Sequence, residues 1–341
     1  MSCAPTSIDS PLIDGHGRTI SYLRISVTDR CDLRCRYCMA EHMTFLPKAA
    51  VLSLEEMAII AERFIARGIR KIRLTGGEPL VRRDVEQLVR RLGSHVGATG
   101  LAGGLDELTM TTNGNHLVEH AAALVDAGLR RINVSLDTRD PELFRYITRH
   151  GDVARVIGGI FAARDAGLRV KINMVALNGQ NDREIAAMLA WCRDEGLDLT
   201  LIETMPLGAI DEDRTDRFLP LTAVLDELKG AFPLVRDTHD SGGPARYWRV
   251  DGSDTRLGLI SPLTANFCST CNRVRLTTEG ILYTCLGHDD QVDLKTILRT
   301  QGVAGLDTAL DAAMGTKPQR HEFDIAATAP AVSRHMSVTG G

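Results

Sequence analysis

A repeated unit of helix, glycine, apolar residue and strand constrains the fold of this chain more than any other feature. A glycine followed by Ile or Leu precedes a short β-forming stretch at Gly68, Gly128, Gly167 and Gly196. Glycine is common at left-handed helix C-caps, and β-branched residues favour strands. The alternation of strands and helices therefore predicts a parallel sheet with right-handed crossovers.

Two more predicted strands, over residues 21–28 and 108–112, bring the count to six βα units that end near Met205. Ser53 and Glu56 form a capping box at the start of the first helix. A closed barrel of this kind needs eight units, so six units predict an incomplete (β/α)6 barrel. A flat, doubly wound sheet is the alternative fold.

After Met205 the repeat stops, and the chain divides into three predicted parts. Residues 1–19 form a mobile lead-in, residues 20–206 the partial barrel and residues 207–341 a C-terminal domain. That last part contains predicted helices over 221–229 and 292–314 and predicted strands over 247–250, 256–259 and 280–283.

Composition excludes several classes of function. The 341 residues carry a net charge of −4, so nucleic-acid binding has no electrostatic support. No apolar run has the length of a membrane span, and no charged-then-apolar signal pattern precedes the chain's first strand. We therefore expect a cytoplasmic protein, where eight cysteines indicate metal binding or catalysis rather than disulfides.

Six of the cysteines form two sets of three. Cys31, Cys35 and Cys38 are spaced Cys-x-x-x-Cys-x-x-Cys, and we call them the first trio. The second trio is Cys268, Cys271 and Cys285. Three thiolates leave an open position on a metal centre, and Cys is also the usual ligand of iron–sulfur clusters. A zinc site completed by a distant ligand, such as His288 for the second trio, is the alternative.

Small and polar residues follow the predicted strands, at the end where such barrels carry their active sites. These strand exits are Thr75-Gly76-Gly77-Glu78-Pro79, Thr111-Thr112-Asn113-Gly114, Ser135-Leu136-Asp137 and Glu203-Thr204-Met205-Pro206. We expect a ligand site there. His116, Glu119 and His120 also match a His-x-x-Glu-His zinc motif, but we interpret them as a solvated helix face.

The first trio, with Tyr37 directly before its last cysteine, resembles the signature of radical S-adenosylmethionine (SAM) enzymes, and the Gly-Gly-Glu turn resembles their SAM-binding element. Residues 267–276 read Phe-Cys-Ser-Thr-Cys-Asn-Arg-Val-Arg-Leu, and the chain ends in Gly-Gly. With these motifs, residues 20–290 resemble the GTP 3',8-cyclase family, which begins molybdenum cofactor biosynthesis.

The resemblance implies a TIM-type partial barrel of the radical SAM class, closed by the C-terminal extension, with two [4Fe-4S] clusters. The first trio would hold the SAM cluster, and the second trio would hold a cluster that takes the guanine base. The implied SAM contacts are Tyr37, Gly77, Ser135 and Met205; the implied GTP contacts are Arg24, Arg73, Thr111, Lys171, Arg273 and Arg275; and the implied catalytic tail is Gly340 and Gly341.

The implied reaction removes hydrogen from C3' of GTP with a 5'-deoxyadenosyl radical, joins C3' to C8 and yields 3',8-cyclo-7,8-dihydro-GTP. The implied partners are an electron donor of the flavodoxin or ferredoxin type, a second copy of the chain and cyclic pyranopterin monophosphate synthase, which takes the product. A radical SAM peptide maturase with an auxiliary cluster is the alternative enzyme, and a zinc-stapled binding module the alternative without catalysis. Two positions depart from the family: Thr200 stands where Arg is usual, and Gly287 where Phe is usual.

Overall fold

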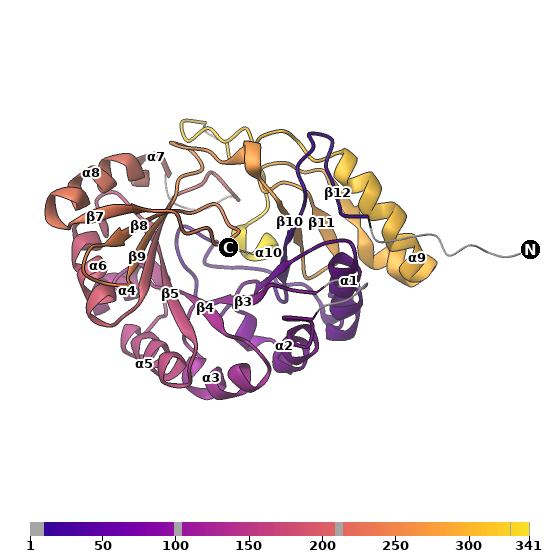
Figure 1. The fold of residues 1–341 in the computed structure, drawn as a ribbon, viewed down its shortest axis with the longest axis horizontal. Coiled ribbons are helices and arrows are strands. Elements are labelled where there is room, and N and C mark those ends of the chain that lie inside the picture. Colours follow the sequence, from indigo (N-terminus) through magenta and orange to yellow (C-terminus); the bar gives the residue numbers. More distant parts are fainter. Residues whose placement is uncertain (1–9, 99–103, 209–213, 328, 341) are drawn as a thin grey trace, which may run out of the picture.

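Within the residues that the structure describes, twelve strands form one continuous sheet that curves into an open barrel, with helices packed on its outside (Figure 1). The structure is a computed structural model, and it describes residues 10–98, 104–208, 214–327 and 329–340. The strand order is β12-β11-β10-β1-β2-β3-β4-β5-β6-β9-β8-β7.

The first six strands are parallel neighbours in chain order, which confirms the predicted βα units and the partial barrel. These strands are β1 (Tyr22–Ser26), β2 (Lys71–Thr75), β3 (Glu107–Thr112), β4 (Arg131–Ser135), β5 (Arg169–Ala176) and β6 (Asp198–Glu203). The helices that cover them are α1 (Leu54–Ala66), α2 (Val85–Gly93), α3 (Leu117–Asp126), α4 (Pro141–Thr148), α5 (Val153–Asp165) and α6 (Ile185–Asp194).

The C-terminal part extends the sheet at both ends. Strand β10 pairs in parallel with β1, and β9 pairs in parallel with β6, so the chain returns to both sides of the six-stranded core. The C-terminal elements are α7 (Arg214–Arg217), α8 (Leu221–Ala231), β7 (Leu234–Asp237), β8 (Arg246–Val250), β9 (Arg256–Ile260), β10 (Arg273–Leu276), β11 (Ile281–Tyr283), β12 (Gln291–Asp293), α9 (Leu294–Gly315) and α10 (Met336–Thr339). Strands β7, β10 and β12 were not predicted from the sequence.

The apolar core lies between the sheet and its helices. On α1, Met57, Ile60, Phe64 and Ile65 are at most 1% exposed, as the helical periodicity predicts. The capping box also forms: Ser53 Oγ accepts a hydrogen bond from the Glu56 amide, and the Glu56 carboxylate accepts one from the Ser53 amide. The outer face of the sheet is therefore closed by apolar packing, which leaves the inner face for a site.

The second half of the expected lead-in packs against the rest of the protein, so the expectation of a mobile segment is wrong for residues 10–19. Leu12 is 1% exposed, and the Arg18 guanidinium donates to the carbonyl oxygens of Cys268 (2.6 Å) and Pro318 (2.7 Å). Residues 1–9 lie outside the described part of the chain.

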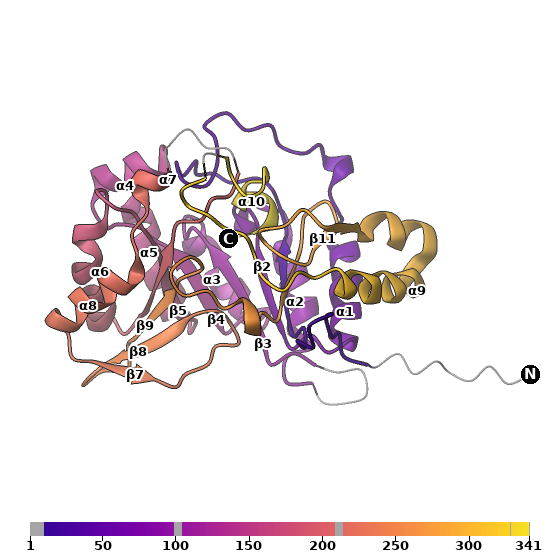
Figure 2. The same ribbon diagram turned by 90° about the horizontal axis from the view of Figure 1, so that it is seen from above.

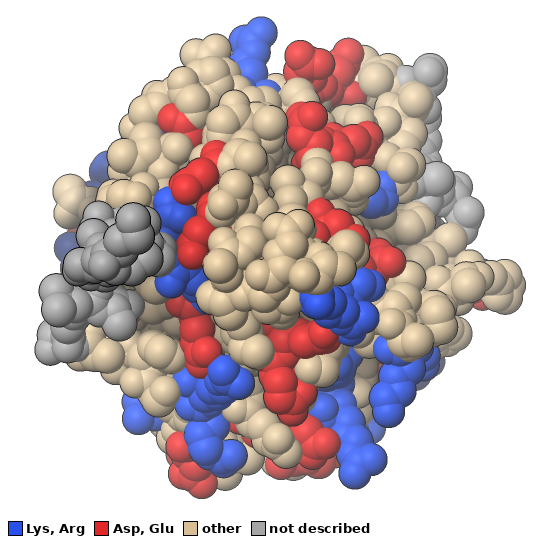
Figure 3. All heavy atoms as spheres, turned by 90° about the vertical axis from the view of Figure 1, so that its right-hand side faces the viewer, with Lys and Arg blue, Asp and Glu red and all other residues tan. Residues whose placement is uncertain are grey.

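Helix α9 is joined to α1 by ion pairs between side chains far apart in sequence. Arg63 pairs with Asp307, and Arg299 pairs with Glu56 at 2.7 Å. On this side of the molecule positive and negative side chains are intermixed (Figure 3). The short α10 and the described C-terminal end lie instead at the centre of the barrel in both ribbon views (Figures 1 and 2). None of the helices in the described ranges has both the length and the apolar character needed to cross a bilayer.

Candidate active site

A cavity inside the barrel is lined by both cysteine trios, including Cys31 and Cys268. All four residues that the sequence assigned to SAM line it: Tyr37, Gly77, Ser135 and Met205. Four of the six residues assigned to GTP line it as well: Arg24, Thr111, Arg273 and Arg275. Segments far apart in the sequence thus place the two cysteine trios and several arginine side chains around one cavity.

The first trio lies on the loop that follows β1. Burial raises the pKa of the Cys31 thiol to about 12 and that of Cys38 to about 11, and it also raises the pKa of Cys35. These thiols are neutral until a metal centre replaces their protons, because metal binding favours the thiolate. Three soft sulfur donors on one short loop fit an iron–sulfur cluster with an open iron position.

Among the residues with described positions, no three or more His, Cys, Asp or Glu side chains converge closely enough to bind a single metal ion. A four-iron cluster is a larger body, and its thiolate ligands stand further apart than those of one ion. His288, the alternative fourth ligand for zinc, instead places Nε2 3.0 Å from the Arg320 carbonyl oxygen.

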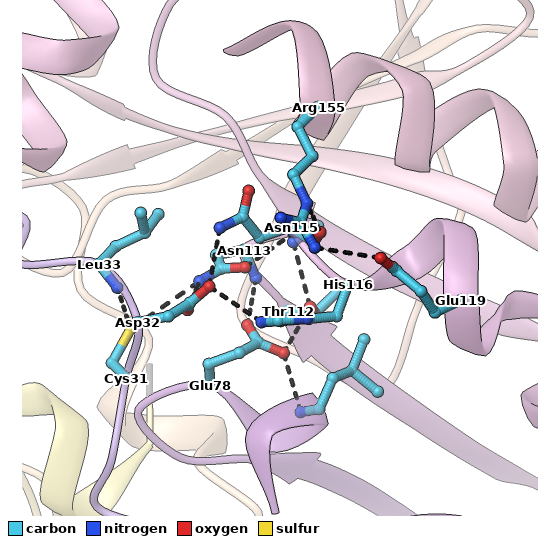
Figure 4. A network of polar contacts seen from close by, with 12 residues as sticks. Cys31, Asp32, Leu33, Glu78, Thr112, Asn113, Asn115, His116, Glu119 and Arg155 are labelled. Carbon is cyan, nitrogen blue, oxygen red and sulfur yellow. Dashed lines mark hydrogen bonds and ion pairs between the residues drawn. The ribbon is translucent and has the colours of Figure 1, made fainter. Parts of the chain in front are cut away.

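Asp32 ties the first-trio loop to the end of β3 (Figure 4). Asn113 and Asn115 each donate a side-chain hydrogen bond of 2.7 Å to its carboxylate, and His116 Nε2 lies 3.1 Å from the same group. Burial raises the pKa of Asp32, but these amide hydrogen bonds outweigh it and the net pKa is lowered. The carboxylate is therefore held as an anion next to Cys31, and its partners fix the direction of the loop.

This network corrects one expectation about the His-x-x-Glu-His segment. His116 faces Asp32 and His120 Nδ1 lies against the Glu86 carboxylate, so both rings are partly buried and paired rather than solvated. Glu119 is exposed and pairs with Arg155. No local pattern in the sequence indicates Asp32 as the partner of His116, since more than 80 residues separate the two.

The Gly-Gly-Glu turn after β2 packs directly against the backbone that leads into the first trio. A Cβ on Gly77 would lie 2.3 Å from the Arg30 carbonyl oxygen, and one on Gly76 would lie 2.4 Å from that of Thr28. The Gly77 amide donates to the Thr28 carbonyl at 2.8 Å. Both glycines are therefore required for the close approach of the loop that carries the first trio.

Glu78 completes that turn from a fully buried position. Its carboxylate accepts hydrogen bonds from the amides of Leu80 (2.9 Å) and Asn113 (2.6 Å) and from the Thr112 hydroxyl (2.7 Å). Burial raises its pKa to about 7 despite these donors. Glu78 therefore fixes the ends of β2 and β3 to each other, below the cavity wall.

Tyr37 and Asp137 join the first trio to the end of β4. The Tyr37 hydroxyl donates a 2.7 Å hydrogen bond to Asp137, whose other oxygen accepts from the Val175 amide at 2.8 Å. Burial raises the pKa of Asp137 to about 6. Both side chains line the cavity, so the pair orients the aromatic ring that stands between two cysteines.

The second trio has a different electrostatic setting. Cys271 lies 3.8 Å from an Arg273 guanidinium nitrogen and 3.7 Å from Lys317 Nζ. Burial alone would raise the pKa of Cys271, but the two cations outweigh it and lower that pKa to about 7. Among the described residues, no cation lowers the pKa values of the first trio in this way, whereas Cys271 of the second trio lies beside two positive charges.

Three arginines from neighbouring strands face the inside of the barrel. Arg24 on β1 is in register with Arg275 on β10 and with Arg73 on β2, and residues paired in this way project from the same face of a sheet. Burial, and after it the charge of Arg275, lowers the pKa of Arg24. A row of buried cations of this kind favours an anionic ligand.

Arg73 and Lys171 were assigned to GTP but do not line the cavity. Arg73 donates to the Thr111 hydroxyl at 3.1 Å, and Lys171 Nζ lies 3.0 Å from the Tyr247 hydroxyl. Sequence reasoning also passed over Lys71, which pairs with Glu107 at 2.7 Å. The alternation of side chains along β2 could have found it, since Lys71 and Arg73 share a face.

The described end of the tail reaches the arginine row. Arg275 donates to the carbonyl oxygens of Thr339 (3.1 Å) and Gly340. Gly340 has φ 76°, and a Cβ there would lie 2.1 Å from Thr75 Cγ2. Gly341 lies outside the described residues.

Both departures from the family fall at buried positions. Thr200 is fully buried in register with Asn173 and Gly258, and its hydroxyl has no hydrogen-bond partner among the described residues. A Cβ on Gly287 would lie 2.7 Å from the ring of Phe323, which lines the cavity. The Phe323 ring thus packs where a side chain at residue 287 would begin.

Comparison with known proteins agrees with this geometry. The family model described as Radical SAM superfamily matches residues 25–192, and the one described as Molybdenum Cofactor Synthesis C matches residues 197–323. The GTP 3',8-cyclase of Rhizobium etli (strain CIAT 652) is 56% identical over 344 residues, which cover 100% of this chain and 97% of that protein. The GTP 3',8-cyclase of Erythrobacter litoralis (strain HTCC2594) is 57% identical and covers 97% and 99%. The chain belongs to the GTP 3',8-cyclase family.

Among solved structures, Streptococcus suis SuiB bound to S-adenosylmethionine matches with a TM-score of 0.59 at 14% identity, covering 95% of this chain and 78% of that one. SuiB bound to its precursor peptide SuiA gives the same TM-score. At such identities the likeness concerns the fold alone. As a member of its family the chain is a radical SAM enzyme, and its cofactors are SAM and two [4Fe-4S] clusters.

Proposed function

We propose that this chain converts GTP into (8S)-3',8-cyclo-7,8-dihydroguanosine 5'-triphosphate, the first step of molybdenum cofactor biosynthesis. One observation carries the proposal: Arg24, Arg273 and Arg275 line the same cavity as the two separate thiol trios. A triphosphate is the anion that such a group suits, because arginine offers bidentate contacts to phosphate oxygens.

We assign the first trio to the SAM cluster and the second to the cluster that faces the guanine base. When bound, the first cluster and SAM supply a carbon radical able to remove hydrogen from the ribose. The side chains of this protein bind and orient SAM and GTP. Tyr37, Gly77, Ser135 and Met205 form the wall against which SAM is held, and the hydrogen bond to Asp137 keeps the Tyr37 ring in place.

Arg24, Arg273 and Arg275 bind and orient the triphosphate, with the Thr111 hydroxyl beside them on the cavity wall. Arg73 donates a hydrogen bond to that hydroxyl, and Lys171 adds positive charge at the same register level of the sheet. Gly340, at the described end of the tail, narrows the reaction space beside Arg275. We propose that residues 20–206, the partial barrel, and residues 207–341, the C-terminal domain, are the two domains of the enzyme.

Anaerobic turnover tests this function. The purified chain with both clusters is mixed with SAM, a chemical reductant and GTP carrying deuterium at C3'. The products should be cyclised GTP and 5'-deoxyadenosine that has gained the label, identified by mass. Unlabelled 5'-deoxyadenosine with no cyclised nucleotide would show that GTP is not the substrate. That result would favour the alternative function, a radical SAM peptide maturase.

We propose an electron donor of the flavodoxin or ferredoxin type, a homodimer as the working form and cyclic pyranopterin monophosphate synthase as the enzyme that receives the product. The seven described cysteines are all free thiols, which suits a reducing cytoplasm.

A further inference from the structure

Lys317, directly beyond the end of α9, is buried against the second trio. It is 3% exposed, and its ammonium group has three partners: the Arg273 carbonyl oxygen at 2.9 Å, the Thr284 carbonyl oxygen at 2.5 Å and Cys271 Sγ at 3.7 Å. A lysine ammonium has three N–H donors, so this arrangement uses all of them. Lys317 does not line the cavity; it lies behind the wall that the cysteines form.

The three partners lie on the two segments that carry the second trio. Arg273 begins β10, Thr284 directly precedes Cys285, and Cys271 ends the short turn that starts at Cys268. One ammonium group therefore connects the segments that carry the thiols, and it sets their distance from one another.

The charge of Lys317 has no carboxylate to balance it among the described residues. A buried cation is costly unless an anion compensates it. Two neutral carbonyl groups supply hydrogen bonds but no charge, and the acidic group within reach is a cysteine thiol. The nearby Arg273 adds to the same imbalance. The site of the second trio therefore favours a group with net negative charge. Three thiolates bound to an iron–sulfur cluster form such a group.

We propose that Lys317 is a positioning residue for the second cluster: its fixed positive charge beside Cys271 holds the thiolate toward the cluster and raises the potential at which that cluster accepts an electron. The proposal rests on the assignment of the second trio to a cluster in the proposed function. Positive charge and hydrogen bonds at a cysteine sulfur stabilise the reduced, more negative cluster, so they raise its reduction potential.

The test isolates the second cluster. In a Cys35→Ser background, which removes one ligand of the first, the chain is reconstituted with iron and sulfide, and the reduction of the remaining cluster is followed by electron paramagnetic resonance during a redox titration. Lys317→Met, which keeps the length of the side chain, should shift the potential to a more negative value. Neither GTP nor SAM is present, so the result does not depend on which reaction the enzyme catalyses.

Lys295→Met is the matched control. Lys295, near the start of α9, likewise donates to a backbone carbonyl, that of Ala50 at 2.6 Å, but among the described residues no hydrogen bond joins it to a sulfur. Its replacement should leave the potential unchanged. An unchanged potential in Lys317→Met, or an equal shift in Lys295→Met, would overturn the proposal.

If Lys317→Met assembles no second cluster, its thermal stability tests the proposal instead. Its thermal midpoint is then compared with that of Cys35→Ser/Cys271→Ser, which lacks the second cluster for a known reason. Equal midpoints would mean that Lys317→Met lost only the cluster, in support of the proposal. A midpoint well below this reference would make Lys317 a residue of the fold and reject the role at the cluster.

Discussion

The Tyr37 hydroxyl donates a 2.7 Å hydrogen bond to the carboxylate of Asp137, and this contact joins the cysteine loop after β1 to the end of β4. Asp137 is 5% exposed, so water has little access to compete for this hydrogen bond. The ring between two cluster-binding cysteines is therefore fixed by a residue 100 positions away.

Tyr37→Phe tests the strength of this contact. Removal of the hydroxyl leaves a buried carboxylate with one donor fewer, which should lower the free energy of unfolding by about 1.5–3 kcal/mol. Denaturant unfolding measures the loss, and Tyr146→Phe is the control because Tyr146 is 45% exposed. Equal small effects of the two changes would show that the Asp137 contact adds little.

The assignment of the trios predicts two separable losses. Cys35→Ser should abolish 5'-deoxyadenosine formation and leave iron at the second site. Cys271→Ser should retain SAM cleavage and lose cyclised GTP. Iron analysis and product masses distinguish the two variants, and undiminished SAM cleavage by Cys35→Ser would refute the assignment of the first trio.

Gly340→Ala should displace the tail. Its Cβ would overlap Thr75, and φ 76° is unfavourable for alanine. We expect cyclised GTP to disappear while both clusters and SAM cleavage persist. Gly302→Ala is the matched control, since Gly302 has φ 67° with no atom near its Cβ position; it should cost about 1 kcal/mol of stability from backbone strain and leave activity intact. Full activity of Gly340→Ala would mean that the tail end does not shape the site.

Glu78 gives the protein a pH-dependent stability. Burial raises its pKa from 4.5 to about 7, so the folded state binds this proton more tightly than the unfolded state. The stabilisation is complete below about pH 4.5 and is lost as the pH rises through about 7. Between pH 5 and 8 the unmodified chain should therefore lose roughly 2–3 kcal/mol more stability than Glu78→Gln. Parallel pH profiles of the two proteins would contradict this origin.

Thr200→Arg tests the missing family arginine. The new cation would lie on β6 near Lys171, whose pKa is already lowered by burial and by Arg131 and Arg73. The ligand-free variant should be less stable, whereas GTP should bind more tightly, by up to roughly a hundredfold for one charge-assisted hydrogen bond. Thr200→Val, which removes only an unpaired hydroxyl, should change neither property. Weaker or equal GTP binding by Thr200→Arg would show that another residue makes this contact.

The amino-acid sequence by itself determined the parts of this protein that depend on local pattern. The glycine-ended helices located β2, β4, β5 and β6, and the capping box located α1, because backbone conformation there follows from neighbouring residues. The spacing of Cys31, Cys35 and Cys38 marked one site for the same reason, since a short loop has few ways to arrange three thiols.

Only the tertiary structure decided how these parts meet. Strand β10 is held by its pairing with β1, about 250 residues earlier in the chain, and its own sequence of Arg, Val, Arg and Leu has no stronger strand signal than many loops. Arg73 and Lys171 do not line the cavity, and their positions follow from the register of the sheet. Asp32 meets Asn113, and Lys317 meets Cys271, across 81 and 46 residues. Such contacts form because the packing of the whole chain brings distant buried polar groups together, and no local pattern in the sequence encodes that choice.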